Sequence, residues 1–191
     1  MRFMAGMARL AGGAAMLAAV VVVSPPAGWG DPGQFPDLNS YVQVDPAPFE
    51  TYTTYGSDGR GVQFSTPGGY RCRMIKNVRG GWMSVSCWGS LPGTSQNLVT
   101  GGDMSPARFS TVDLAAQETY QRYEGTEPHT YTVNPDDYKP LPSGSKVTKQ
   151  GTGAQSGTCG VDAAMTACEI EGGPTGERHG FVLSPQGSST F

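Results

Sequence analysis

Charge is sparse in this sequence, and the little positive charge present is scattered. The chain of 191 residues holds 13 basic and 16 acidic residues, and no two of its Lys and Arg residues are adjacent. The backbone of a nucleic acid would be repelled by the net negative charge. There is also no basic cluster to hold an anionic membrane. We therefore expect no nucleic-acid partner.

Motifs for catalysis, metals and cofactors are also missing. Ser57 lacks the G-x-S-x-G turn of a serine hydrolase, because Tyr55 stands where its first glycine belongs. Gly151 and Gly153 have neither the lysine nor the strand–helix context of a phosphate loop. With two histidines and no C-x-x-C spacing, a zinc site is a weak alternative for the four cysteines. We expect no metal, no cofactor and no catalytic set.

Long apolar runs are absent except at the start of the chain. Arg2 and Arg9 precede an uncharged run over residues 10–23, and Ser-Pro-Pro follows it directly. This is the pattern of a secretory signal peptide, and the run is shorter than a membrane span needs. We predict a signal peptide over residues 1–30 with cleavage before Asp31; an uncleaved anchor is the alternative. After cleavage no stable membrane span is expected.

The segment after the predicted cut suits one compact unit of 161 residues. Without the two leader arginines it keeps 11 basic and 16 acidic residues, a net charge of −5. Glycine and proline are abundant, at 28 and 15 residues over the whole chain, which favours short strands and turns over long helices. We expect a mainly β, turn-rich fold with at most one short helix. Residues 31–62 form a Pro/Gly-rich lead-in with the first strands, and residues 63–191 a disulfide-containing β-rich domain.

Alternation and turn residues place the individual elements. The predicted strands cover residues 41–44, 49–55, 62–65, 70–77, 81–88 and 180–184, with another beginning at 146–148. Residues 112–123 are the best helix candidate, although their Thr and Tyr content suits a strand equally well. Residues 91–105 and 127–142 are predicted to be loops.

The four cysteines are expected to form two disulfides, since an even number in an exported chain favours pairing. A two-residue loop at Arg79-Gly80, joining the strands over residues 70–77 and 81–88, would place Cys72 directly opposite Cys87, at a separation suited to a disulfide. Cys159 and Cys168 then form a tighter second pair. Each half of the chain thus has a Pro/Gly turn and a disulfide-closed hairpin, which suggests an internal duplication or a coincidence among turn-rich sequences.

The same hairpin register separates two faces. One is apolar, and the other carries Arg71, Arg73, Trp82 and Trp88, with Arg71 opposite Trp88 as a candidate cation–π pair. Exposed aromatics beside arginine are typical of contact surfaces. These four residues are our candidate binding face. The alternative is that a second sheet covers this face and buries both tryptophans.

Several of these segments also resemble a known family. Phe-Ser-Thr-Pro-Gly-Gly-Tyr-Arg-Cys at residues 64–72, followed by Val-Ser-Cys at 85–87, is similar to the "F-x-S/T-P-x-G-x-x-C … C" element of small exported actinobacterial, particularly mycobacterial, proteins. Thr158-Cys159 through Cys168 resembles that group's second element, and His-Gly-Phe-Val-Leu-Ser at residues 179–184 its closing one. The resemblance implies export and two short-range disulfides, with no established activity, substrate or cofactor. Thr66 to Tyr70 departs from the Ser-Pro-Ser-Gly-Asn common in relatives.

Two functional hypotheses follow. The first is a non-catalytic protein of the cell envelope or extracellular medium that binds an envelope component or a protein partner. The second is an envelope-acting hydrolase in which His179 works with a serine, such as Ser184, or with a carboxylate. Candidate carboxylates occur in pairs, and they are Asp136, Asp137, Glu169 and Glu171.

Overall fold

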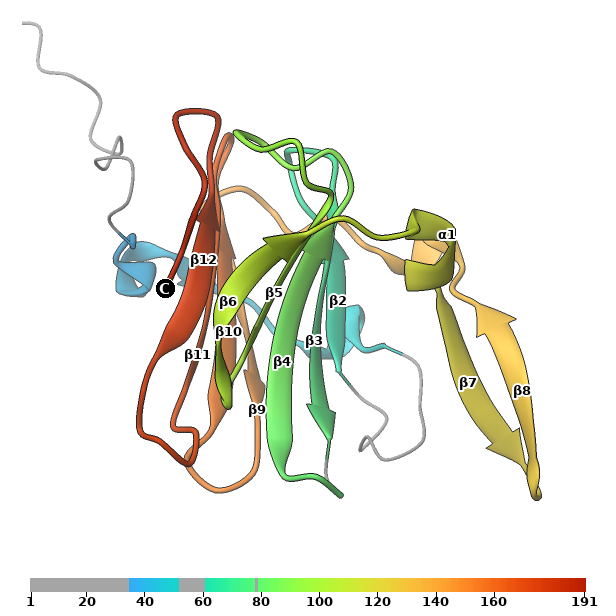
Figure 1. Cartoon of the computed structure of the whole chain (residues 1–191). Coiled ribbons are helices and arrows are strands. Elements are labelled where there is room, and N and C mark those ends of the chain that lie inside the picture. The colour runs from blue at the N-terminus through green and yellow to red at the C-terminus, as the bar shows by residue number, and fades with distance from the viewer. Residues whose placement is uncertain (1–34, 52–60, 78) are drawn as a thin grey trace, which may run out of the picture.

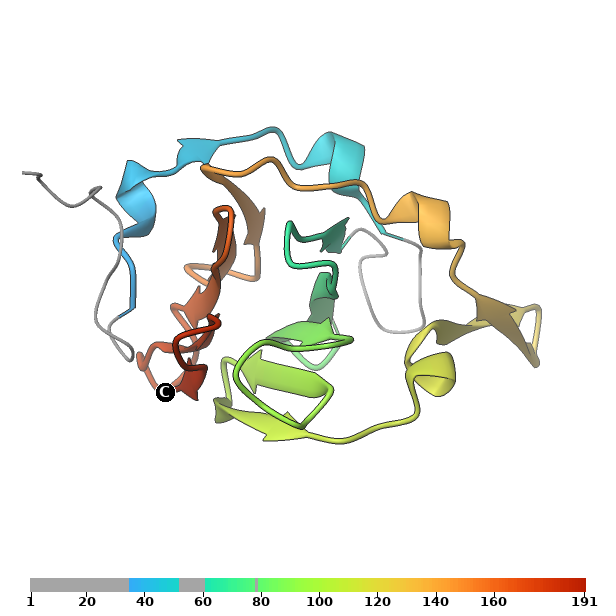
Figure 2. The same ribbon diagram turned by 90° about the horizontal axis from the view of Figure 1, so that it is seen from above.

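Two β-sheets packed face to face make up the body of the protein, and a separate β-hairpin lies outside them (Figures 1 and 2). The structure is a computed structural model, and it describes residues 35–51, 61–77 and 79–191. The strands are β1 Val42–Gln43, β2 Val62–Ser65, β3 Arg71–Asn77, β4 Trp82–Trp88, β5 Leu98–Gly102, β6 Ser105–Ser110, β7 Thr119–Glu124, β8 Glu127–Thr132, β9 Ser145–Gln150, β10 Ser156–Val161, β11 Thr166–Glu171, β12 His179–Leu183 and β13 Ser189–Thr190. The helices are α1 Leu114–Gln117 and the 3-10 turns η1 Leu38–Ser40, η2 Ala47–Phe49 and η3 Pro135–Asp137.

The two large sheets repeat one topology. Strands β2 to β6 follow one another as an antiparallel meander, and strands β9 to β13 do the same, with β1 added in parallel beside β9. In each meander a disulfide joins the second strand to the third. One links Cys72 to Cys87 and the other Cys159 to Cys168. The repetition suggested by the sequence is therefore present in the strand order and in the placement of the disulfides.

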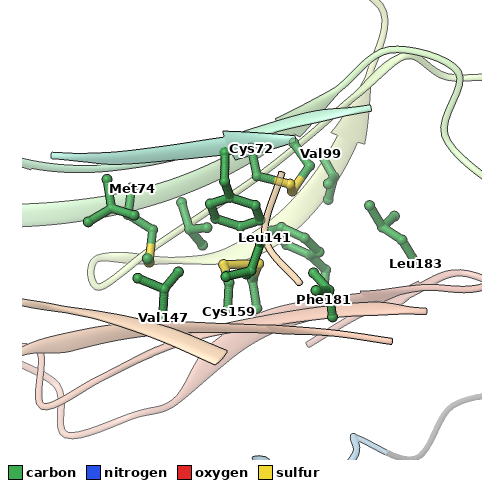
Figure 3. Packing of buried hydrophobic residues seen from close by; sticks show 14 of the residues in the cluster. Cys72, Met74, Val99, Leu141, Val147, Cys159, Phe181 and Leu183 are labelled. Carbon is green, nitrogen blue, oxygen red and sulfur yellow. A yellow bond between two sulfur atoms is a disulfide. The ribbon is translucent and has the colours of Figure 1, made fainter. Parts of the chain in front are cut away.

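Both disulfides belong to the core between the sheets (Figure 3). Each joins residues directly opposite in the ladder, with Cα–Cα distances of 4.0 and 4.1 Å. All four cysteines have no exposed surface. Phe181 of one sheet and Phe64 of the other are equally buried in this cluster. The predicted pairing is confirmed, and the pairs fill space in the core in addition to cross-linking it.

The predicted register of the first hairpin is also confirmed. Cys72, Met74, Met83, Val85 and Cys87 all lie on the core face with no exposed surface. The same alternation predicts Val78 for this face, but Val78 lies outside the described residues. An alternating pattern identified the buried face correctly because a strand has a side-chain period of two.

The prediction for residues 112–123 was wrong in large part. A helix begins after Asp113, whose carboxylate accepts a hydrogen bond from Ala115 N at 2.9 Å, but it ends at Gln117. Thr119–Glu124 is then strand β7, paired with β8. Because aromatic and β-branched residues pack well on a pleated strand, the Thr and Tyr content prevailed over the apolar spacing.

The segments predicted as loops were also partly wrong. Residues 91–105 contain β5, and residues 127–142 contain β8 and η3. Of the strand predicted over residues 49–55, Phe49 belongs to η2, and residues 52–55 lie outside the described part. Across the described ranges, no helix is long and apolar enough to cross a membrane. The predicted signal peptide also lies outside the described residues.

Candidate functional site

The face of the β2–β6 sheet that points away from the core, here called the outer face, carries most of the polar side chains of that sheet. One ladder row crosses all five strands, and its members are Gln63, Arg73, Ser86, Thr100 and Arg108. Within this row, the hydroxyls of Ser86 and Thr100 are hydrogen-bonded at 3.0 Å. The outer face therefore has a hydroxyl-rich centre and arginine on two strands.

One end of the outer face is covered by the excursion, the chain segment that runs from α1 through β7 and β8 to η3 (Figure 2). Glu118 holds it in place: its Oε1 accepts hydrogen bonds from Arg71 Nη1 at 2.6 Å and Trp88 Nε1 at 2.7 Å. Its Oε2 accepts one from the Tyr138 hydroxyl at 2.8 Å. Trp88, Leu98, Val133 and Tyr138 then form a separate small core.

The arginines complete this contact by stacking. The guanidinium carbon of Arg73 lies 4.7 Å from the ring centroid of Trp88, and that of Arg71 lies 4.9 Å from the ring of Tyr138. An Arg73 N–H also donates to the Tyr138 hydroxyl. Arg71 and Trp88 are directly opposite as predicted, but the cation stacked on Trp88 is Arg73, two residues along the strand. Arg71 is drawn instead towards Glu118 and Tyr138.

Glu118 is ionised in this setting. Burial alone would raise the pKa of its carboxyl, but hydrogen bonds from Trp88, Arg71 and Tyr138, with the charge of Arg71, outweigh that effect and lower the pKa. The result is a charge-assisted contact between the excursion and the sheet.

The candidate binding face is therefore divided. Trp88 and Arg73 are buried, at 2% and 8% exposure, and act as structural residues. Arg71 is partly covered by its ion pair with Glu118. Trp82, at the other end of β4, is 38% exposed. The excursion therefore covers the part of the candidate binding face that carries Trp88 and Arg73, and Trp82 is left exposed.

Trp82 forms the wall of a pocket, here called the Trp82 groove, with a volume of about 340 Å³. The groove lies where β4, β5 and β6 meet the turn between β5 and β6. It is lined by Trp82, Met83, Ser84, Thr100, Gly101, Gly102, Asp103, Met104, Ser105, Pro106 and Arg108. Its size falls at the lower end of the ~300–1,000 Å³ typical of small-molecule sites. Exposed Met104 also lines the groove, and exposed Arg108 supplies a positive charge.

A buried brace holds the turns around this groove. Gln155, from the other sheet, donates from Nε2 to Gly81 O at 2.9 Å and to Asp103 Oδ2 at 2.5 Å. Gly81 immediately precedes Trp82, and Asp103 is itself part of the groove wall. Asp103 is 1% exposed, and its Oδ1 accepts no hydrogen bond from the described residues. The brace thus fixes the aromatic wall and leaves one carboxylate oxygen unsatisfied beside it.

The structure separates the residues of the hydrolase hypothesis. His179 begins β12 and Ser184 follows its end, so about 16 Å of extended strand lies between them. Ser184 is hydrogen-bonded within its own turn, to Gln186 at 2.5 Å. A pairing of His179 with Ser184 is therefore wrong. The exposed Glu177 lies beside His179, with its Oε2 3.6 Å from Nε2.

The carboxylate pairs are not gathered into one site. Asp136 and Asp137 are exposed in η3, on the excursion. Glu169 lies 3.2 Å from Arg178, and burial raises the pKa of its carboxyl. None of these four acids lines the Trp82 groove. Within the described ranges, no group of three or more His, Cys, Asp or Glu side chains is arranged to hold a metal ion.

Some polar and functional residues were not predicted, and others have structural partners. The hydroxyl of Tyr41 donates to Asp162 at 3.3 Å. Tyr52 and Tyr55 lie outside the described part. The sequence alone did not point to Thr100 and Asp103, which fall in the predicted loop over residues 91–105, or to Arg108, for which no element is predicted. The alternation of Val99 and Gly101 with Thr100 and Gly102 was the one signal for a strand there.

Comparison of the chain with protein-family models, curated proteins and solved structures finds no match. The fold and the site therefore define only a class: a disulfide-pinned protein of two facing antiparallel sheets, with an aromatic groove on one outer face. Two disulfide-bonded cysteine pairs are typical of proteins that work outside the cytoplasm.

Proposed function

We propose that this chain is an exported, non-catalytic binding protein of the cell envelope or extracellular medium, and that its ligand surface is the Trp82 groove. The observation that carries the proposal is the exposed indole of Trp82 in the wall of a preformed pocket. A large aromatic ring exposed to water costs free energy unless a ligand covers it, and tryptophan is enriched among the residues that dominate binding.

The brace behind the groove supports the same proposal. Gln155 links the turn before Trp82 to Asp103, although it lies 74 residues from Gly81 and 52 from Asp103 in the sequence. Rigid surroundings reduce the entropy lost on binding, so a preorganised wall favours affinity. By contrast, the buried Trp88 is satisfied by Arg73 and Glu118 and offers no surface to a ligand.

The experiment is a co-sedimentation assay with isolated cell envelope from the producing organism. We expect the parent protein to sediment with the envelope and Trp82→Ala to remain in solution. Tyr123→Ala, which removes a 48% exposed ring on β7, is the matched control and should sediment like the parent. Equal sedimentation of the parent and Trp82→Ala, or none of either, would contradict the proposal.

The hydrolase alternative now rests on His179 with Glu177 or a distant carboxylate. It has weaker support, because His179 is 6% exposed and does not line the Trp82 groove. Turnover of a chromogenic ester or glycoside by the parent, abolished in His179→Ala, would favour it over the binding proposal.

A further inference from the structure

The chemistry of the Trp82 groove indicates which class of ligand it takes. Its exposed apolar side chains are the indole of Trp82 and the thioether of Met104. Its floor carries hydroxyls, from Ser84 and Thr100, and the bare backbone of Gly101 and Gly102. A flat apolar wall above a hydroxyl floor suits a ligand with an apolar face and a hydrogen-bonding rim.

We infer that the ligand is a saccharide chain, with one sugar ring stacked on Trp82 and its hydroxyls directed to Ser84, Thr100 and Arg108. This inference rests on the proposed function. The C–H bonds on one face of a pyranose ring form a flat apolar surface that packs against the negative face of an indole. The hydroxyls around the ring both donate and accept, which matches the hydroxyl groups of Ser84 and Thr100.

The charged groups of the groove fit the same ligand. Arg108 is exposed and presents N–H donors to hydroxyl or carboxylate oxygens. Asp103 Oδ1 is buried in the wall and accepts no hydrogen bond from the described residues. Because this oxygen has almost no accessible surface, Asp103 shapes the wall of the groove and does not itself contact a ligand. Of the two charged side chains that line the groove, Arg108 is exposed and Asp103 is buried. The groove therefore favours a neutral or weakly anionic ligand.

A peptide fits less well. The groove lies on the face of the sheet, where β4 and β5 already pair their backbone groups with each other, so a peptide could not add as another strand there. Peptide sites that take a helix or a proline-rich segment are lined with several apolar or aromatic side chains. The Trp82 groove has a single aromatic ring. Its other apolar side chains, Met83, Met104 and Pro106, are interspersed with the polar side chains of Ser84, Thr100, Asp103, Ser105 and Arg108.

The test uses the same envelope in three forms: untreated, oxidised with periodate and then quenched, and digested with protease. Periodate cleaves vicinal diols and so destroys sugar rings, while protease removes proteins. We expect sedimentation of the parent protein to survive protease and to be lost after periodate. Thr100→Val, which removes a hydroxyl at nearly constant shape, and Arg108→Gln should each bind about three- to tenfold more weakly.

Trp82 also provides a spectroscopic readout. Stacking should quench the indole or shift its emission on addition of solubilised envelope polysaccharide, and the change should be absent in Trp82→Ala. Trp82→Phe, which keeps a smaller ring, should bind more tightly than Trp82→Ala. Tyr123→Ala should behave like the parent in every arm.

The outcomes separate the two proposals. Binding that depends on Trp82, resists periodate and is lost after protease would overturn the saccharide inference and leave the proposed function standing. Binding that does not depend on Trp82 would overturn both. Loss after periodate alone, together with weaker binding of Thr100→Val, supports both.

Discussion

Trp82 and Trp88 are the two ends of strand β4 and point to the same outer face, yet one is 38% exposed and the other 2%. Glu118 makes the difference, because its carboxylate binds the Trp88 indole N–H and so places the excursion over that end of the sheet. The two tryptophans therefore have separate roles, one in stability and one at the surface.

Replacing Trp88 by alanine should lower the free energy of unfolding much more than replacing Trp82. Trp88→Ala removes a buried ring and the stacking partner of Arg73, so we expect the free energy of unfolding to fall by about 3–5 kcal/mol. Trp82→Ala should cost less than about 1 kcal/mol, because that ring is partly in water. Urea unfolding measured by circular dichroism compares them directly. Similar losses in both variants would contradict the assigned roles.

The disulfides should contribute unequally to stability. Loop closure over 15 residues is worth about 3 kcal/mol in the chain-entropy model, and closure over 9 residues about 2.6 kcal/mol. Replacing Cys72 and Cys87 together by Ala should therefore destabilise slightly more than replacing Cys159 and Cys168. Denaturant unfolding of both double variants measures the order, with the reduced parent as the reference for losing both bonds.

The Glu118 contact should make stability depend on pH in the acid range. The pKa of Glu118 in the folded state lies below the ordinary value of 4.5, so its contribution is complete above about pH 4.5 and is lost as pH falls through the folded-state pKa. Glu118→Gln should lower the free energy of unfolding by about 1–2 kcal/mol at neutral pH.

This difference between Glu118→Gln and the parent should shrink below pH 4.5, because the parent carboxyl is then protonated as well. Thermal unfolding at several pH values measures it. Glu127→Gln, on the exposed β8 strand, is the control and should match the parent throughout. A gap that stays constant down to pH 3 would mean that the charge of Glu118 does not hold the excursion.

Removal of the predicted signal peptide and formation of the disulfides should both be visible in the intact mass of the exported protein. If the leader over residues 1–30 is removed, protein recovered outside the cytoplasm begins at Asp31 and carries no free thiol. Intact mass measured before and after reduction should differ by four hydrogens, one for each cysteine. A mass that includes the leader would favour the uncleaved anchor, and four alkylatable thiols without reductant would contradict the disulfides.

The features that the sequence predicted correctly depend mostly on residues that lie close together in the chain. The pairing of Cys72 with Cys87 and of Cys159 with Cys168 spans 15 and 9 residues, within single hairpins. Because the side-chain period of a strand is two, the register and the buried face followed from the same local pattern. The mainly β fold followed from composition, and strand β2 was predicted with its observed bounds.

The role of each tryptophan was decided only by tertiary structure. Glu118 lies 47 residues from Arg71, and Gln155 lies 52 residues from Asp103. No local sequence pattern predicts contacts over such separations. Trp82 and Trp88 have the same residue type, strand and face, and sequence alone treats them as equals. The excursion buries one, and the brace from the other sheet holds the other in the groove wall, because burial depends on which distant segments fold back over a side chain.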